Sequence, residues 1–218
     1  MHTYSIDRDL RAKVVVIIFV LSMIISLVLN DFCSGIIGGL VKYLENSRIK
    51  SVVNLLEWLE VNPNFLGIPF WYGILTVVYD KYIWKLLIKW HQIPDLNGKW
   101  VGKLISSFDE KSIDMEMEIE QTWSKISFKS IFPQTNSLSY SNVAAIYVDG
   151  NNGTEIYFGF KNESYSVQNK MQSYNGYNVL KLFGNSKIKA RYFNERENPD
   201  PNIKGGNKGI FELERIER

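Results

Sequence analysis

The sequence contains few of the residues that catalysis, metal binding and disulfide bonding require. Its 218 residues include one cysteine and two histidines, and both histidines precede Pro94. The lone Cys33 cannot form an intramolecular disulfide, which favours a reducing compartment. No Cys/His metal spacing, glycine-rich phosphate loop or nucleophile elbow is present. We therefore expect no enzyme, no metal centre and no cofactor.

The part of the chain after Pro94 also lacks an excess of either charge. It has 16 basic and 16 acidic residues, so the net charge of +2 belongs to the N-terminal part. Polymeric nucleic acid usually needs a basic face, and we do not expect it as a partner. A few focused cations would still allow a small anion to bind in a pocket.

The N-terminal part contains two long apolar runs. Val14–Leu29 contains nothing more polar than two serines, and a second run extends over Phe65–Tyr79. Since a spanning helix needs about 20 apolar residues, we predict transmembrane helices at about 12–33 and 65–84. Basic residues precede the first run and follow the second, which predicts that both termini are cytoplasmic. A cleaved signal peptide is the alternative for the first run, and a buried core helix is the alternative for the second.

The segment between the two runs has apolar residues at helical spacing, which predicts an amphipathic helix over about 48–60. A short basic stalk over 85–94 follows the second run and ends at Pro94. We assign residues 1–94 to a membrane module in contact with the lipid bilayer.

From Asp95 onward the hydrophobic period changes to two residues. Ile113–Glu120 alternates apolar and acidic residues, which is typical of a half-buried strand. Turn signals separate about eight such segments, namely 99–106, 113–120, 123–131, 143–148, 154–161, 177–183, 187–193 and 209–216. We predict that 95–218 forms a small antiparallel β-barrel of about eight strands. Its interior is either filled by side chains or able to hold one small ligand.

The phase of the last predicted strand places a cation on its apolar face. Arg215 shares a face with Phe211 and Leu213. A guanidinium turned inward needs an anionic partner, because a buried unpaired charge is costly. The alternative is a frayed strand end with Arg215 in solvent.

Five motifs occur in a recognisable order: Asp95–Gly102, Ile119–Trp123, Ser137–Ser141, Tyr192–Arg196 and Gly209–Arg215. With two helices followed by a barrel, this order resembles the two-transmembrane, β-strand-rich effectors of bacterial cyclic-oligonucleotide antiphage systems of the CBASS type. The long Pro/Gly segment after Arg196 departs from that pattern.

The resemblance implies a mechanism. A nucleotide cyclase makes a cyclic di- or oligonucleotide, the barrel binds it, and the effectors form homo-oligomers that disrupt the bacterial inner membrane in abortive infection. Phosphates would pair with Arg or Lys and bases would stack on aromatic rings. The motif match implies that the ligand is bound by Arg196, Tyr192, Trp123, Ser139 and Tyr140, and motif and strand phase together add Arg215.

Several alternatives stay open at this point. Packing at a barrel end is the competing role for Trp100 and Trp123, and the ligand either activates or restrains the effector. A lipocalin-like, membrane-tethered carrier of a lipid or other apolar molecule is the second candidate function. A membrane adaptor with a filled barrel is the third.

Overall fold

The structure, a computed structural model, describes residues 1–44, 50–61, 63–107, 112–135, 137–148, 153–164, 173–195 and 207–216. The chain divides into two compact units. One unit combines Met1–Arg8 with Trp84–Arg218, and the other is Asp9–Ile83.

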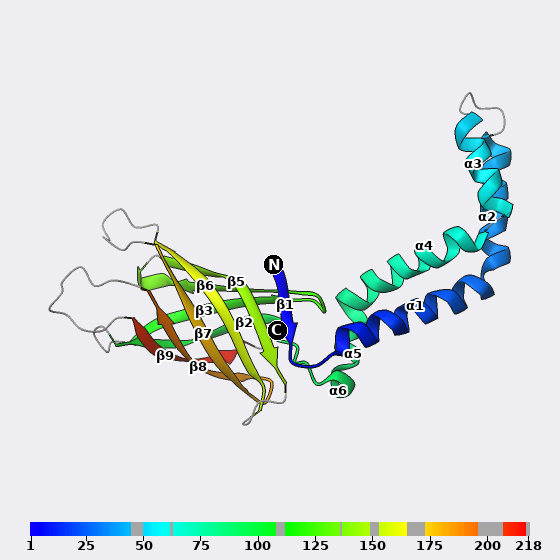
Figure 1. Cartoon of the computed structure of the whole chain (residues 1–218). Helices are drawn as coiled ribbons and strands as arrows, with labels where there is room; N and C mark the ends of the chain where they lie inside the picture. The colour runs from blue at the N-terminus through cyan, green and yellow to red at the C-terminus, as the bar shows by residue number, and fades with distance from the viewer. Residues whose placement is uncertain are drawn as a thin grey trace. The chain divides into compact units, whose positions relative to one another are not determined.

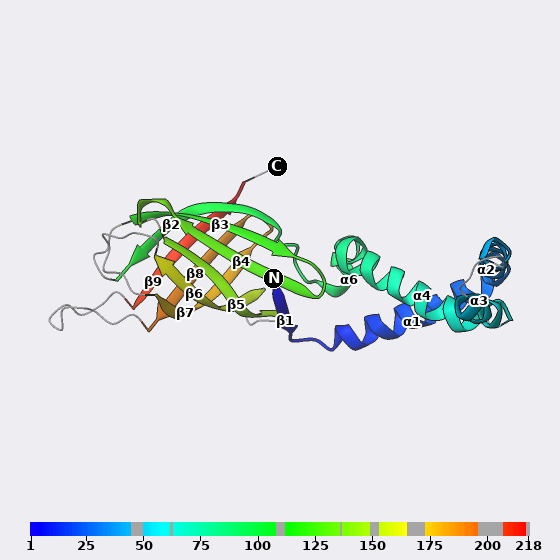
Figure 2. The ribbon, with the colours of Figure 1, turned by 90° about the horizontal axis from the view of Figure 1, so that it is seen from above.

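The described residues of the first unit form a closed barrel of nine strands (Figures 1 and 2). The strands are β1 (His2–Ile6), β2 (Gly98–Ser106), β3 (Ser112–Gln121), β4 (Lys125–Phe132), β5 (Ser137–Tyr147), β6 (Glu155–Ser164), β7 (Tyr174–Phe183), β8 (Lys187–Asn194) and β9 (Lys208–Arg215). Their order round the barrel is β1-β4-β3-β2-β9-β8-β7-β6-β5, and pairing of β4 with β5 closes it. The prediction of a closed barrel is confirmed, with one strand more than expected.

The additional strand is β1, at the N-terminus of the chain. It pairs antiparallel with β4, where His2 lies opposite Ile126, and parallel with β5, where Tyr4 lies opposite Ala144. The expectation of a wholly antiparallel barrel is therefore wrong at this strand. The partners of β1 lie more than 100 residues away along the chain, so no local hairpin signal reveals it.

The alternation seen in the sequence determines which side chains fill the barrel. On β3, Met115 and Met117 are buried while Glu116 and Glu120 are exposed. Two of the acidic residues lie opposite lysines: Asp114 faces Lys103 of β2, and Glu118 lies between Lys99 of β2 and Lys129 of β4. Such opposite-charge pairs stabilise neighbouring strands modestly, so the acidic row is an outer face, as predicted.

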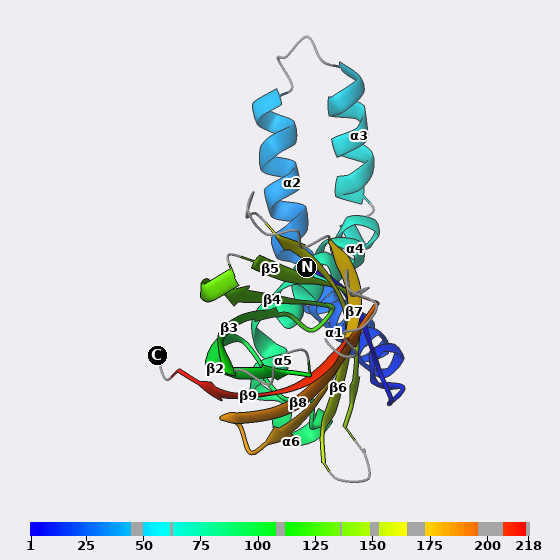
Figure 3. The same ribbon diagram turned by 90° about the vertical axis from the view of Figure 1, so that its left-hand side faces the viewer.

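The second unit is helical. It contains α1 (Leu10–Val28), α2 (Asn30–Leu44), α3 (Lys50–Val61), α4 (Pro63–Val78) and the π-helical turn η1 (Tyr79–Ile83). α1 packs along α4 (Figure 1), and α2 packs along α3 (Figure 3). The helix predicted at about 48–60 corresponds to α3. The short helices α5 (Trp84–Leu86) and α6 (Ile88–His91) belong to the barrel unit.

Among the described helices, α1 alone has the length and apolar composition to cross a membrane. It ends at Val28, whereas the predicted span extends to residue 33. The second predicted span is divided between two helix types. Its α-helical part, α4, has 16 residues with Pro69 inside it and is followed by η1.

The buried face of α1 contains Leu10, Val14 and Ile18 in its first half, but its C-terminal half has the reverse polarity of a helix on a water-soluble protein. Ser22 and Ser26 are buried at 0% and 2% exposure, whereas Val16, Leu27 and Val28 are 60% to 75% exposed. Ser22 donates its hydroxyl hydrogen to the carbonyl of Phe19 at 2.6 Å. A surface helix in water normally buries its apolar stripe and exposes its polar residues.

Candidate ligand site in the barrel

The barrel encloses a cavity of about 100 Å³ at the end where β2, β4 and β8 finish. Its wall is formed by side chains of β2 to β9 that point inward, together with Thr135. The lining residues are Leu104, Ser106, Ile113, Met115, Ser130, Phe132, Thr135, Ser137, Ser139, Phe160, Tyr174, Asn178, Tyr192, Asn194 and Phe211.

Two aromatic rings of the wall lie against glycines of neighbouring strands. Phe160 is the cross-strand partner of Gly176, and Tyr192 is the partner of Gly209. A Cβ atom on Gly176 would lie 2.3 Å from Phe160 Cζ, and one on Gly209 would lie 2.5 Å from Tyr192 Cε1. The absence of a side chain at the two glycines leaves room for the rings to lie against the backbone of the neighbouring strand.

The polar groups of the wall are neutral hydroxyls and carboxamides. The Asn162 Nδ2 group donates to Ser139 Oγ at 2.8 Å. Asn162 is 1% exposed, and its Oδ1 atom has no hydrogen-bond partner among the described residues. Asn178 lines the cavity at 6% exposure, and its carboxamide makes no hydrogen bond within the described part of the chain.

Among the described residues, no charged side chain lines the cavity. Lys189 lies 3.0 Å from Glu212 on the outer face and lowers the pKa of that carboxyl below its ordinary value. A hydrogen bond from Tyr157, assisted by Lys181 at 3.2 Å, likewise lowers the pKa of Glu155. The described part of the cavity wall is therefore neutral, whereas the outer surface of the barrel carries charged residues.

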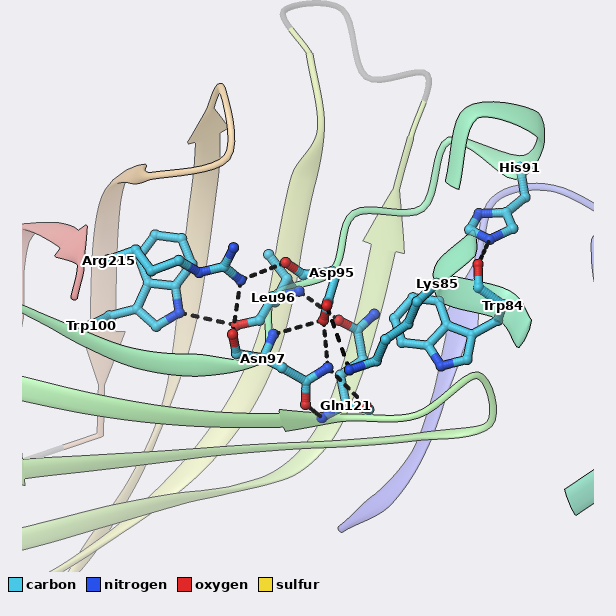
Figure 4. Close-up of polar contacts among 9 residues, drawn as sticks. All are labelled: Trp84, Lys85, His91, Asp95, Leu96, Asn97, Trp100, Gln121 and Arg215. Atoms are coloured by element: carbon cyan, nitrogen blue, oxygen red, sulfur yellow. Dashed lines mark hydrogen bonds and ion pairs between the residues drawn. The ribbon is translucent and has the colours of Figure 1, made fainter. Parts of the chain in front are cut away.

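The opposite end of the barrel is closed by a plug, here defined as Asp95–Asn97 with Trp100, Gln121 and Arg215 (Figure 4). The Arg215 guanidinium lies 4.8 Å from the Trp100 ring centroid. Its Nη2 group donates to the carbonyls of Asp95 at 2.5 Å and Asn97 at 2.9 Å. The indole N–H of Trp100 donates to the Leu96 carbonyl at 3.0 Å.

The plug is tied to the end of β3 by reciprocal hydrogen bonds. The Gln121 backbone N–H donates to Asn97 Oδ1 at 2.7 Å, and Asn97 Nδ2 donates to the Gln121 carbonyl at 2.9 Å. The Gln121 side-chain oxygen accepts from the Leu96 N–H at 2.8 Å. These contacts give the Asp95–Gly102 motif a structural role, since they hold the entering chain across the barrel end.

A buried histidine adjoins the plug. His91 donates from Nε2 to the Trp84 carbonyl at 2.7 Å and accepts at Nδ1 from the Ile93 N–H at 3.0 Å. This pattern requires the neutral ring. Burial lowers the pKa of His91, and this effect exceeds that of the hydrogen bond to Trp84. The His91 ring lies 5.3 Å from that of Trp123.

Two of the predicted ligand residues lie in the cavity wall. Ser139 and Tyr192 both line it. Tyr140, next to Ser139, points to the outer face and is 37% exposed. The alternation of the strand separates the two neighbours within one motif.

The other predicted ligand residues lie elsewhere. Arg215 points inward, as strand phase predicted, but its partners are backbone carbonyls and an aromatic ring of the plug. Trp123 is packed beside His91 at the same closed end. Arg196 lies outside the described residues.

The carboxamides of the cavity wall were not predicted from the sequence. Asn178 and Asn194 both line the cavity. The signal was present for Asn178, because it is two residues before the fully buried Leu180 and therefore shares its face. Tyr174 was missed because β7 begins three residues earlier than predicted. The described residues contain no cluster of potential metal ligands.

Comparison with known proteins identifies a family and a relative. The sequence model described as "Cap15, cyclic dinucleotide receptor domain" matches residues 91–211. The match covers more than half of the chain and includes strands β2 to β8 with the start of β9. A protein of Escherichia albertii named CD-NTase-associated protein 15 is 29% identical over 129 residues. That alignment covers 53% of this chain and 63% of the relative.

Proposed function

This chain belongs to the family of the Cap15 cyclic dinucleotide receptor domain, and on that premise we propose that its barrel binds a cyclic dinucleotide. The chain then acts as an effector in antiphage signalling of the CBASS type, downstream of a nucleotide cyclase. The observation that carries the proposal is that the family match spans the part of the chain that forms the cavity.

The chemistry of the cavity supports a nucleotide over an apolar cargo. Hydroxyls and carboxamides from Ser106, Ser130, Ser137, Asn178 and Asn194 face the interior. An apolar molecule would strip water from these groups without replacing their hydrogen bonds, which is costly. The lipocalin-like alternative is therefore disfavoured.

The reversed polarity in the C-terminal half of α1 supports a bilayer as the surroundings of the helical unit. Where α1 meets α4, Ser26 lies so close to Gly67 that a Cβ there would be 2.2 Å from Ser26 Oγ. Small residues at a helix contact with apolar residues facing outward are typical of membrane helices. We propose that α1 spans the inner membrane, and that α4 crosses it together with η1.

The position of β1 supports two crossings. Residues 1–8 and 84–218 belong to the same unit, so the chain must leave and return on the same side of a bilayer. This favours an even number of crossings within Asp9–Ile83, and the basic residues that flank the two spans favour both termini in the cytoplasm. Cleavage after α1 would remove β1 from the barrel, which argues against a signal peptide.

The proposed output is membrane disruption without catalysis. Ligand binding would shift the chain between assembly states, and oligomers of the helical unit would breach the inner membrane. A ligand shifts such an equilibrium only by its differential affinity for the two states.

The test uses the full chain reconstituted in liposomes loaded with a self-quenching dye. Cyclic dinucleotides are titrated in, with the linear dinucleotide of the same bases as the control. The proposal predicts saturable binding of a cyclic dinucleotide and a change in dye release over the same concentration range. Absence of binding to every cyclic dinucleotide would refute the receptor function, and binding without any change in release would refute the membrane output.

A further inference from the structure

The size of the cavity limits how much of a ligand enters it. Its volume is about 100 Å³, whereas sites that enclose most of a small-molecule ligand measure about 300–1,000 Å³. A whole cyclic dinucleotide is therefore too large for the interior as the structure shows it. The ligand has two kinds of part that differ in charge, namely anionic phosphates and neutral planar bases.

The neutral wall of the cavity favours the bases of the ligand over its phosphates. None of the described lining residues carries a charge, and an anion that is buried without a cationic partner is costly. A nucleobase is uncharged and presents flat faces with hydrogen-bonding edges. The rings of Phe160 and Tyr192, which lie against Gly176 and Gly209, offer surfaces on which a base can stack.

The wall also holds a carboxamide with no partner of its own. Asn178 is 94% buried, lines the cavity and makes no hydrogen bond within the described part of the chain. Its cross-strand neighbour is Tyr192, so the amide and an aromatic ring stand side by side in the wall. The polar atoms of Asn178 are not among the fully buried unsatisfied atoms, so the carboxamide is accessible from the cavity and has hydrogen-bonding capacity to offer a ligand.

A second unsatisfied amide atom lies on the next strand. Asn162 Oδ1 has no hydrogen-bond partner among the described residues, although Asn162 Nδ2 is used by Ser139. Ser139 itself lines the cavity. The unsatisfied hydrogen-bonding capacity of β6 and β7 is therefore concentrated beside the cavity.

We propose that one nucleobase of the ligand enters the cavity and that Asn178 reads its hydrogen-bonding edge, while the phosphates stay outside. The proposal rests on the proposed function and adds to it the part of the ligand that is bound inside. A carboxamide donates and accepts at once, so it pairs in bidentate fashion with a base that presents a donor beside an acceptor, as adenine does. Asn178 then determines which bases the receptor accepts.

The experiment compares the wild-type full chain with Asn178→Leu in detergent micelles. The control is Asn185→Leu, which changes an exposed asparagine in the turn between β7 and β8 at the other end of the barrel. Calorimetric titration uses cyclic di-AMP, cyclic di-GMP and cyclic di-UMP as probes. Thermal unfolding of the ligand-free proteins is measured alongside.

We expect Asn178→Leu to weaken binding of the preferred ligand roughly 10- to 100-fold and to reduce discrimination among bases. We also expect it to unfold at about the same temperature, because the Asn178 side chain makes no hydrogen bond within the described part of the chain that the substitution could break. Asn185→Leu should change neither quantity. A purely structural Asn178 would instead give a lower unfolding temperature, so the two measurements separate the roles.

The outcomes for this inference and for the receptor function are distinct. If the wild type binds neither these three probes nor any mixed-base cyclic dinucleotide, the receptor function itself fails. If the wild type binds and Asn178→Leu keeps its affinity and ranking of bases, the inference alone is overturned. Asn178→Ser removes the carboxamide with less change in polarity, and it must also lose affinity if the amide reads the base.

Discussion

Replacement of Arg215 by alanine separates a role in the plug from a role in ligand binding. The guanidinium donates to two backbone carbonyls and stacks on Trp100. A hydrogen bond to a charged group contributes about 1.5–3 kcal/mol, and a cation–π contact at a partly exposed site adds about 0.5–1 kcal/mol. Because Arg215 is only half-buried, we take the lower part of these ranges and expect a loss of about 2–4 kcal/mol in the free energy of unfolding.

For a chain of this size, that loss lowers the unfolding temperature by about 5–15 °C. The assay is thermal unfolding of the full chain in micelles, followed by near-ultraviolet circular dichroism, which reports on buried indoles such as Trp100. Arg191→Ala is the matched control, since Arg191 is an exposed arginine on the outer face of β8. It should shift the unfolding temperature by no more than about 2 °C, as surface substitutions usually do.

Ligand affinity, measured well below the unfolding temperature, should stay within about twofold of the wild-type value if Arg215 only closes the barrel. The reasoning is refuted if Arg215→Ala unfolds at the wild-type temperature yet binds cyclic dinucleotide at least tenfold more weakly.

Three further predictions concern other parts of the chain. Burial lowers the pKa of His91 below its ordinary value of 6.5 in the folded state, so the unfolded state binds more protons as the pH falls. The contribution of His91 to the unfolding temperature should therefore be constant above pH 6.5 and decrease below it. His91→Gln should reduce this dependence of the unfolding temperature on pH, as thermal unfolding measured at a series of pH values would show. The Cβ of Gly67→Ala would lie 2.2 Å from Ser26 Oγ, whereas the Cβ of Gly73→Ala would have no atom within 4 Å. Only Gly67→Ala should therefore alter ligand-dependent dye release. Equal effects of the two substitutions would contradict the α1–α4 contact. Tyr192→Leu should weaken ligand binding by about 1–3 kcal/mol through lost stacking, while Tyr147→Leu on the outer face should leave titrations unchanged; equal losses would exclude the cavity as the site.

Residue alternation was enough to predict much of the barrel. The period of two in Ile113–Glu120 correctly assigned the inward methionines and the outward acidic row. The same phase placed Arg215 inward. The motif order indicated the receptor family that the comparisons identify.

Long-range contacts explain what the sequence did not reveal. β1 is invisible locally because its partners Ile126 and Ala144 are distant in sequence. Strand phase predicted that Arg215 faces inward but not at which end of the barrel, so the plug was not anticipated. The ligand residues predicted from the sequence were chosen mainly for positive charge, aromatic rings and hydroxyls. The neutral carboxamide of Asn178 was therefore not among them.

The central claim is that the ligand enters the barrel at the end opposite the plug. The most direct measurement is the NMR spectrum of methionine methyl groups labelled with carbon-13 during titration with cyclic dinucleotide. Met115 lines the cavity, whereas Met117 is buried on the same strand outside its wall. We predict that the Met115 methyl resonance shifts in a saturable way and that the Met117 resonance shifts much less. A Met115 resonance that stays unchanged while the protein is saturated with ligand would contradict binding in this cavity.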